Sequence, residues 1–146
     1  MVPSGYYAVL SADGEGNVLV RFPQHPEVNT FGRDWEEAED MASEALNLAL
    51  ESDFDRGVKL PALRKTRVGK GERVVLVPLE AEVRMAFVLR EWRENAGFTQ
   101  QAMASRLGVS YQAYQRMERP GRSNLTVSTL DRIARALGRE LVISVQ

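Results

Sequence analysis

Short runs of β-branched and aromatic residues alternate with turn-forming residues at the start of the chain. The runs YYAVL (6–10) and VLVRF (18–22) are separated by SADGEGN, and EVNTF (27–31) follows the break PQHP. β-branched and aromatic residues favour strands, and clusters of Gly, Asp, Asn and Ser favour the turns between them. The pattern predicts a hairpin and a third strand. The run RVVLVPL (73–79) predicts a fourth.

Between the third and fourth predicted strands the spacing of apolar residues changes to that of a helix. Apolar residues recur every three or four positions in WEEAEDMASEALNLAL, residues 35–50. Asp34 precedes this segment as an N-cap, and Glu37 stands three positions later, which is the spacing of a capping box. Residues 52–70 show no periodicity and are predicted to be a loop. The order β-β-β-α-β predicts a first domain over residues 1–79.

Residues 80–146 show helical spacing in four segments, and we predict a second, all-helical domain here. The first helix lies in EVRMAFVLREWRENA, residues 82–96. Residues suited to N-caps precede the other three helices, and glycines end two of them. These N-caps are Thr99, Ser110 and Thr126, and the glycines are Gly108 and Gly138. The final run ELVISV predicts a terminal strand, so the fold class is α+β with two domains.

Two of these helices, within TQQAMASRLGVSYQAYQRMER (99–119), have the features of a helix-turn-helix. Ala104 is small enough for a second helix to cross closely over it, and Gly108 can adopt the left-handed conformation that redirects the chain. Tyr114 and Met117 are spaced to pack back on the first helix. Polar residues are left on the N-terminal part of the second helix, the part that enters the major groove in this motif. The alternative is an ordinary helical hairpin with a solvated polar face.

The polar residues of this region have side chains suited to DNA. Glutamine pairs with the edge of adenine, and arginine pairs with guanine or with phosphate. At the start of a helix, a side-chain amide and the helix N-terminus can both meet the DNA backbone. The candidate DNA-binding residues are Gln100, Ser110, Tyr111, Gln112, Gln115, Arg116, Arg119, Arg122 and Asn124.

Charge is divided unevenly along the chain, although the net charge is only −1. Residues 1–60 contain 12 acidic and 4 basic residues, whereas residues 61–146 contain 8 acidic and 15 basic residues. Such asymmetry indicates different partners for the two halves, and a basic half suits a phosphate-rich partner. The alternative is that surface charges separated without functional meaning.

Several classes of function lack the residues they need. The chain has no cysteine, which excludes disulfides and thiolate metal sites. The single histidine, His25, lies between two nearby prolines and is predicted to be a turn residue, not a general base. GKGER (69–73) lacks the Lys-Ser/Thr ending of a P-loop. We therefore predict no enzyme activity, no metal and no cofactor. Because no apolar run approaches about 18 residues, we expect a cytoplasmic protein.

The helices in LREWRENAGFTQQAMASRLGVSYQAYQRME resemble those of Xre/Cro-like repressors. The order of motifs over residues 6–51 and 73–146, from YYAVL to ARALGRELVISV, resembles the HicB antitoxin family. The resemblance implies that the first domain has a reduced ribonuclease-H-like fold and binds a HicA toxin, a small RNA-cleaving protein. It also implies that the second domain binds operator DNA and represses the shared operon, and that the protein forms dimers or tetramers.

The acidic helix is the expected toxin-binding surface, because a toxin that binds RNA should be basic. The candidate toxin-binding residues are Glu36, Glu39, Asp40 and Glu44, and the alternative is a solvated helix face. Catalysis of the ribonuclease H type needs an acidic residue on the first strand, and YYAVL has none. A second alternative is a one-component repressor whose first domain senses a small ligand. A pocket lined by buried polar groups would favour that alternative.

Overall fold

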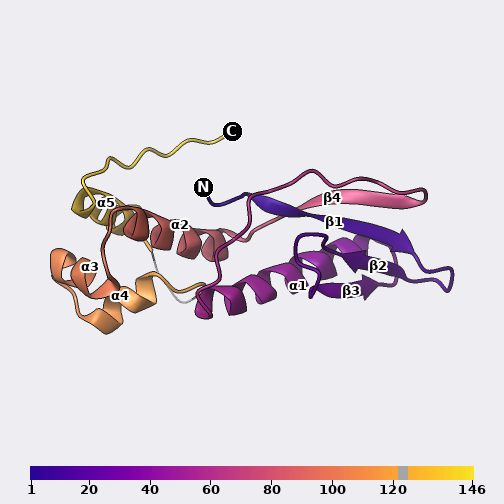
Figure 1. The fold of residues 1–146 in the computed structure, drawn as a ribbon, viewed down its shortest axis with the longest axis horizontal. Helices are drawn as coiled ribbons and strands as arrows, with labels where there is room; N and C mark the ends of the chain where they lie inside the picture. Colours follow the sequence, from indigo (N-terminus) through magenta and orange to yellow (C-terminus); the bar gives the residue numbers. More distant parts are fainter. Residues whose placement is uncertain (122–124) are drawn as a thin grey trace. The chain divides into compact units, whose positions relative to one another are not determined.

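The computed structural model describes residues 1–121 and 125–146, which form two compact units (Figure 1). Unit 1 comprises Met1–Arg84 and unit 2 comprises Met85–Gln146. The sequence predicts a boundary after residue 79, whereas the units divide within helix α2, Ala81–Asn95. No helix in the described residues has the length and apolarity needed to cross a membrane.

Unit 1 is a four-stranded antiparallel sheet with one long helix, α1, against it (Figure 1). The strand order across the sheet is β3-β2-β1-β4, so the last strand in the sequence pairs with the first. The predicted β-β-β-α-β order is confirmed. The elements are β1 (Gly5–Ala12), β2 (Val18–Arg21), β3 (Asn29–Gly32), α1 (Trp35–Asp55) and β4 (Glu72–Pro78).

Helix α1 packs on the sheet through a stripe of small and then larger apolar residues. These residues, at a spacing of four, are all buried: Ala38, Ala42, Leu46, Leu50 and Phe54. A Cβ at Gly32 would lie 2.3 Å from the Ala38 nitrogen, so a glycine at this place lets β3 approach the first turn of α1. The prediction of a loop from residue 52 is wrong for residues 52–55, because the buried stripe continues to Phe54 and keeps the chain helical.

The predicted cap of α1 is present, with one difference. Asp34 Oδ1 accepts a hydrogen bond from the Glu37 N–H at 2.8 Å. A capping box would have the Glu37 carboxylate accept from the Asp34 N–H in return. Instead, Glu37 Oε2 accepts from the N–H of Arg33 at 2.7 Å and from its Nε at 2.9 Å. The reciprocal half of the box is therefore displaced by one residue.

Unit 2 is a small helical domain built from the C-terminal part of α2 and three further helices. These are α3 (Gln100–Leu107), α4 (Tyr111–Met117) and α5 (Val127–Ala136). The centre of its core contains Leu89, Met103, Ala104, Tyr114 and Ile133. The predicted N-caps are confirmed, since the hydroxyl oxygens of Thr99, Ser110 and Thr126 each accept a backbone N–H three residues later at 3.1 Å. The α+β fold class is therefore correct for the chain.

The terminal strand predicted for ELVISV is absent. Residues 139–146 form no helix or strand, and Val142, Ile143 and Val145 are exposed, Val145 by 97%. A strand exists only when its backbone groups pair with those of a neighbour. The described part of a single chain offers this segment no such neighbour, so apolar alternation alone does not make it a strand.

Candidate functional site

Helices α3 and α4 have the close crossing and tight turn that the sequence predicts. Ala104 is buried in the unit 2 core, where its small side chain leaves room for α4. Gly108 ends α3 with φ of 67°, in the left-handed region that glycine enters without steric cost. The Val109 N–H donates to the Ala104 carbonyl at 3.0 Å, which closes the turn before Ser110 begins α4.

Helix α4 has one buried face and one polar face. Tyr114 is fully buried and Met117 packs on the same core. The opposite face carries Tyr111, Gln112 and Arg116, all exposed, with Gln115 half-buried beside them. The structure therefore brings together these four predicted DNA-binding residues on one face of α4, with Arg116 in its last turn.

The remaining DNA-binding candidates lie around this face. Ser110 Oγ accepts the Ala113 N–H, and its own hydroxyl hydrogen remains available to a phosphate oxygen. Gln100 is the first residue of α3 and is half-buried, and Arg119 is exposed just beyond α4. Arg122 and Asn124 lie outside the described residues.

A buried ion pair holds the C-terminal end of α4, and the sequence patterns did not predict it. Glu118, the C-cap of α4, is fully buried, and its two carboxylate oxygens accept from Arg93 of α2. The Arg93 Nε lies 3.0 Å from Oε2, and Nη2 lies 2.9 Å from Oε1. Arg93 Nη1 also donates to the Phe98 carbonyl at 2.8 Å. The two-pronged geometry matches the planar guanidinium to the carboxylate and fixes α4 relative to α2.

The same carboxylate influences two other side chains of unit 2. The Nε of Arg90 lies 4.0 Å from Glu118 Oε1. Burial, followed by the negative charge of Glu118, raises the pKa of Tyr114, which stays neutral at physiological pH. The helix with the polar face is thus held by a capped N-terminus, an apolar core and a buried charged C-terminus.

On unit 1, the acidic residues of α1 form a solvent-facing surface. Glu36, Glu39, Asp40 and Glu44 are exposed, and no ion pair involves them in the part of the chain that the structure describes. Glu37 differs, because it is paired with Arg33 at 2.9 Å.

A groove of about 400 Å³ runs along this acidic surface. Its lining includes Asp40, Glu44, Glu51 and Glu80, and also Leu48, whose side chain is 66% exposed. The groove therefore combines negative charge with an uncovered apolar side chain.

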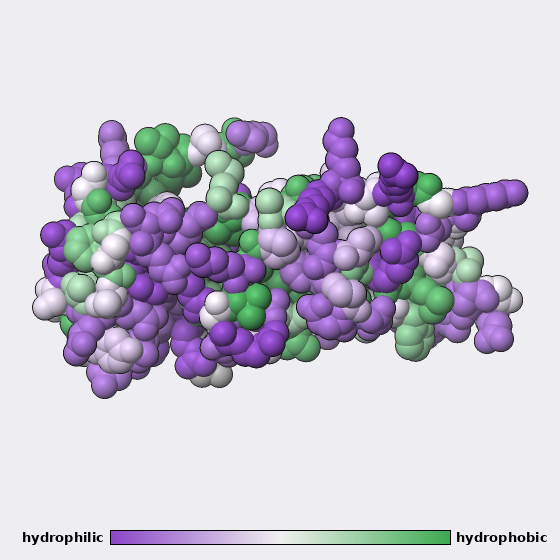
Figure 2. All heavy atoms as spheres, viewed as in Figure 1, coloured by the Kyte–Doolittle hydropathy of each residue, from purple (hydrophilic) through white to green (hydrophobic). Residues whose placement is uncertain are grey.

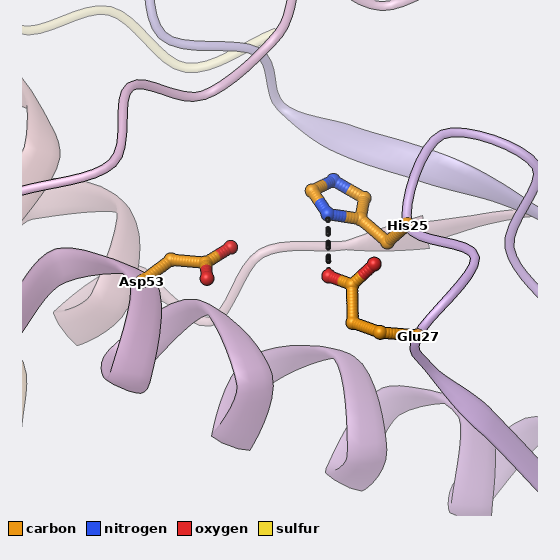
Figure 3. Close-up of side chains that lie close together, drawn as sticks. All are labelled: His25, Glu27 and Asp53. Atoms are coloured by element: carbon orange, nitrogen blue, oxygen red, sulfur yellow. Dashed lines mark ion pairs between the residues drawn. The ribbon is translucent and has the colours of Figure 1, made fainter. Parts of the chain in front are cut away.

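A polar cluster lies on the other side of α1, near its C-terminus. Figure 3 shows His25 and Glu27, from the loop between β2 and β3, and Asp53, from α1. His25 is only 4% exposed, and its Nδ1 lies 3.7 Å from Glu27 Oε1. Its ring packs edge-on against Tyr6 with centroids 4.4 Å apart. His25 is a turn residue, as predicted, since its N–H and carbonyl bond to Phe22 and Val28. Its burial was not predicted.

The three side chains could offer three ligand atoms to a metal ion, but their hydrogen-bond and ion-pair partners do not suit a metal site. Their ligand atoms lie within 4.8 Å of one another. Asp53, however, is already ion-paired with Arg56, and the buried His25 Nε2 has no hydrogen-bond partner. A metal-binding histidine normally donates its second N–H to another group. Burial lowers the pKa of His25 against the opposing charges of Glu27 and Asp53, so the ring is neutral and the cluster is best described as structural.

Comparison with known proteins by sequence gives three results. A family profile described as helix-turn-helix matches residues 89–143. The chain is 31% identical to "Antitoxin HicB 1" of Photorhabdus laumondii over 141 residues, which cover 97% of this chain and 86% of that protein. It is also 43% identical over 56 residues to an "Uncharacterized HTH-type transcriptional regulator" of Methanothermobacter thermautotrophicus, covering 38% of this chain and 80% of that protein.

Among solved structures, the chain is similar to the N-terminal domain of the antitoxin HicB of Burkholderia pseudomallei. The TM-score is 0.42 and the sequence identity is 16%, and the match covers 51% of this chain and 96% of that domain. The relatives are named as an antitoxin and as a transcriptional regulator, and neither name is that of an enzyme.

Proposed function

Because the chain belongs to the HicB antitoxin family, we propose that it neutralises a small, basic, RNA-cleaving toxin of the HicA type and represses the operon that encodes both proteins. In this proposal unit 1 binds the toxin and unit 2 binds operator DNA. The protein acts in the cytoplasm as a binding protein, without catalysis, metal or cofactor.

The DNA-binding part of the proposal rests on the polar face of α4. Tyr111, Gln112 and Arg116 are exposed on a helix whose other side is buried and whose two ends are fixed. A rigid helix with free amide and guanidinium groups suits the major groove, where Gln pairs with adenine and Arg with guanine. In this proposal Ser110, Gln100 and Arg119 contact phosphates, and such contacts position the helix without specifying sequence.

We further propose that two copies bind a palindromic operator. One helix-turn-helix reads few base pairs, and a two-fold dimer places two recognition helices about 34–36 Å apart, one turn of DNA. The apolar segment 141–145 has no strand partner among the residues that the structure describes, and its Val142, Ile143 and Val145 are exposed. The same segment of a second copy can supply the missing hydrogen bonds as an antiparallel partner.

The toxin-binding part of the proposal is supported by the acidic surface of α1. Four carboxylates that form no ion pair with the described residues attract a basic protein and increase its association rate; these are Glu36, Glu39, Asp40 and Glu44. The exposed Leu48 offers an apolar contact within the adjoining groove. Three of the four carboxylates that line this groove are exposed, and the buried Asn47 in its lining is already hydrogen-bonded to backbone groups. The groove therefore favours a protein partner over the small ligand of a one-component sensor.

Charge reversal on α1 tests this surface. The variant Glu39→Lys/Glu44→Lys should bind the small basic protein encoded beside this chain at least about tenfold more weakly at low salt, as expected for opposed charges at an interface. The control Glu15→Lys/Glu82→Lys makes the same charge change at two exposed carboxylates of unit 1 outside α1. The affinity of each variant for the neighbouring protein is measured by calorimetry. Inhibition is measured as the decrease in RNA cleavage by that protein when the variant is added.

Three outcomes separate the parts of the proposal. A loss of toxin affinity in the Glu39→Lys/Glu44→Lys variant, but not in the control variant, supports the assigned surface. Equal affinities of the wild type and both variants would place the toxin contact elsewhere on unit 1. Failure of the wild type to bind the neighbouring protein or to stop RNA cleavage would remove the antitoxin function for this pair.

A further inference from the structure

Unit 1 contains a strongly basic segment that neither proposed function uses. Residues 59–70, KLPALRKTRVGK, contain five basic residues and no acidic one. They connect α1 to β4 and form no helix or strand before the turn at Lys70. Figure 2 shows hydrophilic side chains projecting along the stretch where Figure 1 draws this connection. We call residues 59–70 the basic segment.

The cations of the basic segment differ from three of the five other basic residues of the same unit. Of the remaining two, Arg73 packs over the Trp35 ring, and Arg84 is exposed without an ion pair among the described residues. Arg21, Arg33 and Arg56 are each ion-paired, with Glu72, Glu37 and Asp53 respectively. In contrast, Lys59, Arg64, Lys65, Arg67 and Lys70 are exposed and form no ion pair within residues 1–121 and 125–146. Unit 1 has 15 acidic and 10 basic residues, a net charge of −5, so carboxylates are plentiful. The unpaired cations are therefore not explained by a shortage of partners.

The basic segment is also held in place, although it has no regular structure. The buried Tyr6 donates its hydroxyl hydrogen to the Pro61 carbonyl at 2.6 Å. The side-chain amide of Gln24 donates to the Ala62 carbonyl at 2.8 Å and accepts from the Arg64 N–H at 3.0 Å. Gln24 thus bonds to the segment as a neighbouring strand would. Because these bonds fix the backbone before binding, the segment loses less conformational entropy when its cations bind a partner.

We propose that the basic segment contacts the phosphate backbone of the DNA to which unit 2 binds, as a second, sequence-independent contact. This inference rests on the proposed DNA-binding function. An irregular row of Lys and Arg that form no ion pair among the described residues suits a polyanion of uniform charge, whereas a protein partner is usually matched by cations mixed with other groups. Once unit 2 is bound, the covalent link also keeps DNA at a high effective concentration around unit 1.

The geometry of the segment is compatible with several phosphates. At about 3.3 Å per residue, an extended chain from Arg64 to Lys70 spans at most about 20 Å. Along one strand of duplex DNA, phosphates are spaced about 3.4 Å apart along the axis, so this span faces about six of them. The number of phosphates within reach therefore exceeds the number of cations, which are Arg64, Lys65, Arg67 and Lys70.

The salt dependence of DNA binding tests the inference with the full chain. Each lost phosphate contact makes the slope of log K against log salt concentration shallower by about 0.9. The variant Lys65→Gln/Arg67→Gln should therefore show a slope shallower by about 1.8 on a 40-bp duplex from the promoter of its own gene. The matched control Arg21→Gln/Arg33→Gln removes the same charge from two locally paired cations of unit 1 and should leave the slope near the wild-type value.

A random 40-bp duplex, tested in parallel, should show the same change because phosphate contacts carry no sequence information. An unchanged slope in the Lys65→Gln/Arg67→Gln variant overturns the inference while leaving DNA binding by unit 2 intact. An equal change in both variants also overturns it, since the effect would then come from net charge. Loss of binding to the neighbouring toxin without a change in slope would assign the segment to a protein partner instead. If the wild type binds neither duplex, the proposed DNA-binding function itself has failed.

Discussion

The buried pair between Arg93 and Glu118 makes a quantitative prediction about unit 2. Replacing Glu118 with Gln keeps the size of the side chain but removes its charge, so Arg93 stays buried without a counterion. The Glu118 side chain is fully buried and that of Arg93 is only 11% exposed, so solvent screens the loss very little. Removing one partner of a buried ion pair typically costs about 3–5 kcal/mol of unfolding free energy. Small domains have only about 5–15 kcal/mol in total, so unit 2 should become marginally stable.

The two tryptophans allow this change to be measured in unit 2 alone. Trp35 lies in unit 1 and Trp92 in unit 2, and the chain has no other tryptophan. In a Trp35→Phe background, urea unfolding followed by fluorescence therefore reports Trp92. Glu118→Gln should shift the midpoint strongly downward, and operator affinity should fall because α4 loses its fixed C-terminus.

A double variant separates a buried charge from lost packing. Arg93→Met/Glu118→Leu removes both charges and fills similar volume, so it should be much more stable than Glu118→Gln alone. The reasoning would be refuted if Glu118→Gln cost less than about 1 kcal/mol, the range of an exposed pair. It would also be refuted if the double variant were less stable than the single one, because the carboxylate would then matter for reasons other than its pairing with Arg93.

Three further predictions concern other parts of the chain. Burial lowers the pKa of His25 in the folded state, so as pH falls the unfolded state binds a proton at His25 before the folded state does. The contribution of His25 to the stability of unit 1 should therefore be complete above the unfolded pKa of about 6.5. It should decrease as pH falls toward the lowered pKa of the folded state. Urea unfolding of a Trp92→Phe background, followed by Trp35 at pH 7.5 and 5.5, should show this loss, and His25→Gln should reduce it; an unchanged difference would mean that other groups cause it. Gln112→Ala should cost about 1–3 kcal/mol at one operator base pair and relax specificity there, measured with a set of singly substituted duplexes; a uniform loss on all duplexes would contradict its role in base readout. Ile143→Asp should convert a dimer into a monomer of 16.4 kDa in light scattering, and a mass equal to that of the wild type would show that the C-terminal segment is not the dimer interface.

Local chemistry determined much of the fold, and the sequence was sufficient to predict it. The N-caps Thr99, Ser110 and Thr126 bond to backbone three residues away, and Gly108 turns the chain through its own φ angle. Such interactions depend on residues within one or two helical turns, so their spacing in the sequence is nearly their spacing in space. The same reasoning placed Gln112 and Arg116 on the outer face of α4, because Tyr114 and Met117 must be inside.

Only tertiary structure decided which distant charges meet. Glu118 and Arg93 are 25 residues apart, and nothing in their local patterns distinguishes them from the exposed charges around them. Asp53 stood in a predicted loop, so its approach to His25 was not foreseeable. Gln24 likewise orders the basic segment from 38 to 40 residues away.

The C-terminal segment shows a strand prediction that failed because it needed a pairing partner. Its apolar residues have the composition of a strand, yet Val142, Ile143 and Val145 are exposed in a segment that pairs with no strand in the described part of the chain. Composition determines that such a segment is suited to a sheet, but pairing requires donors and acceptors on a neighbour. Sequence therefore determined the local elements, where the partner is a few residues away. Tertiary structure decided every interaction whose partner lies elsewhere in the chain, because long-range contacts depend on how all the elements pack together.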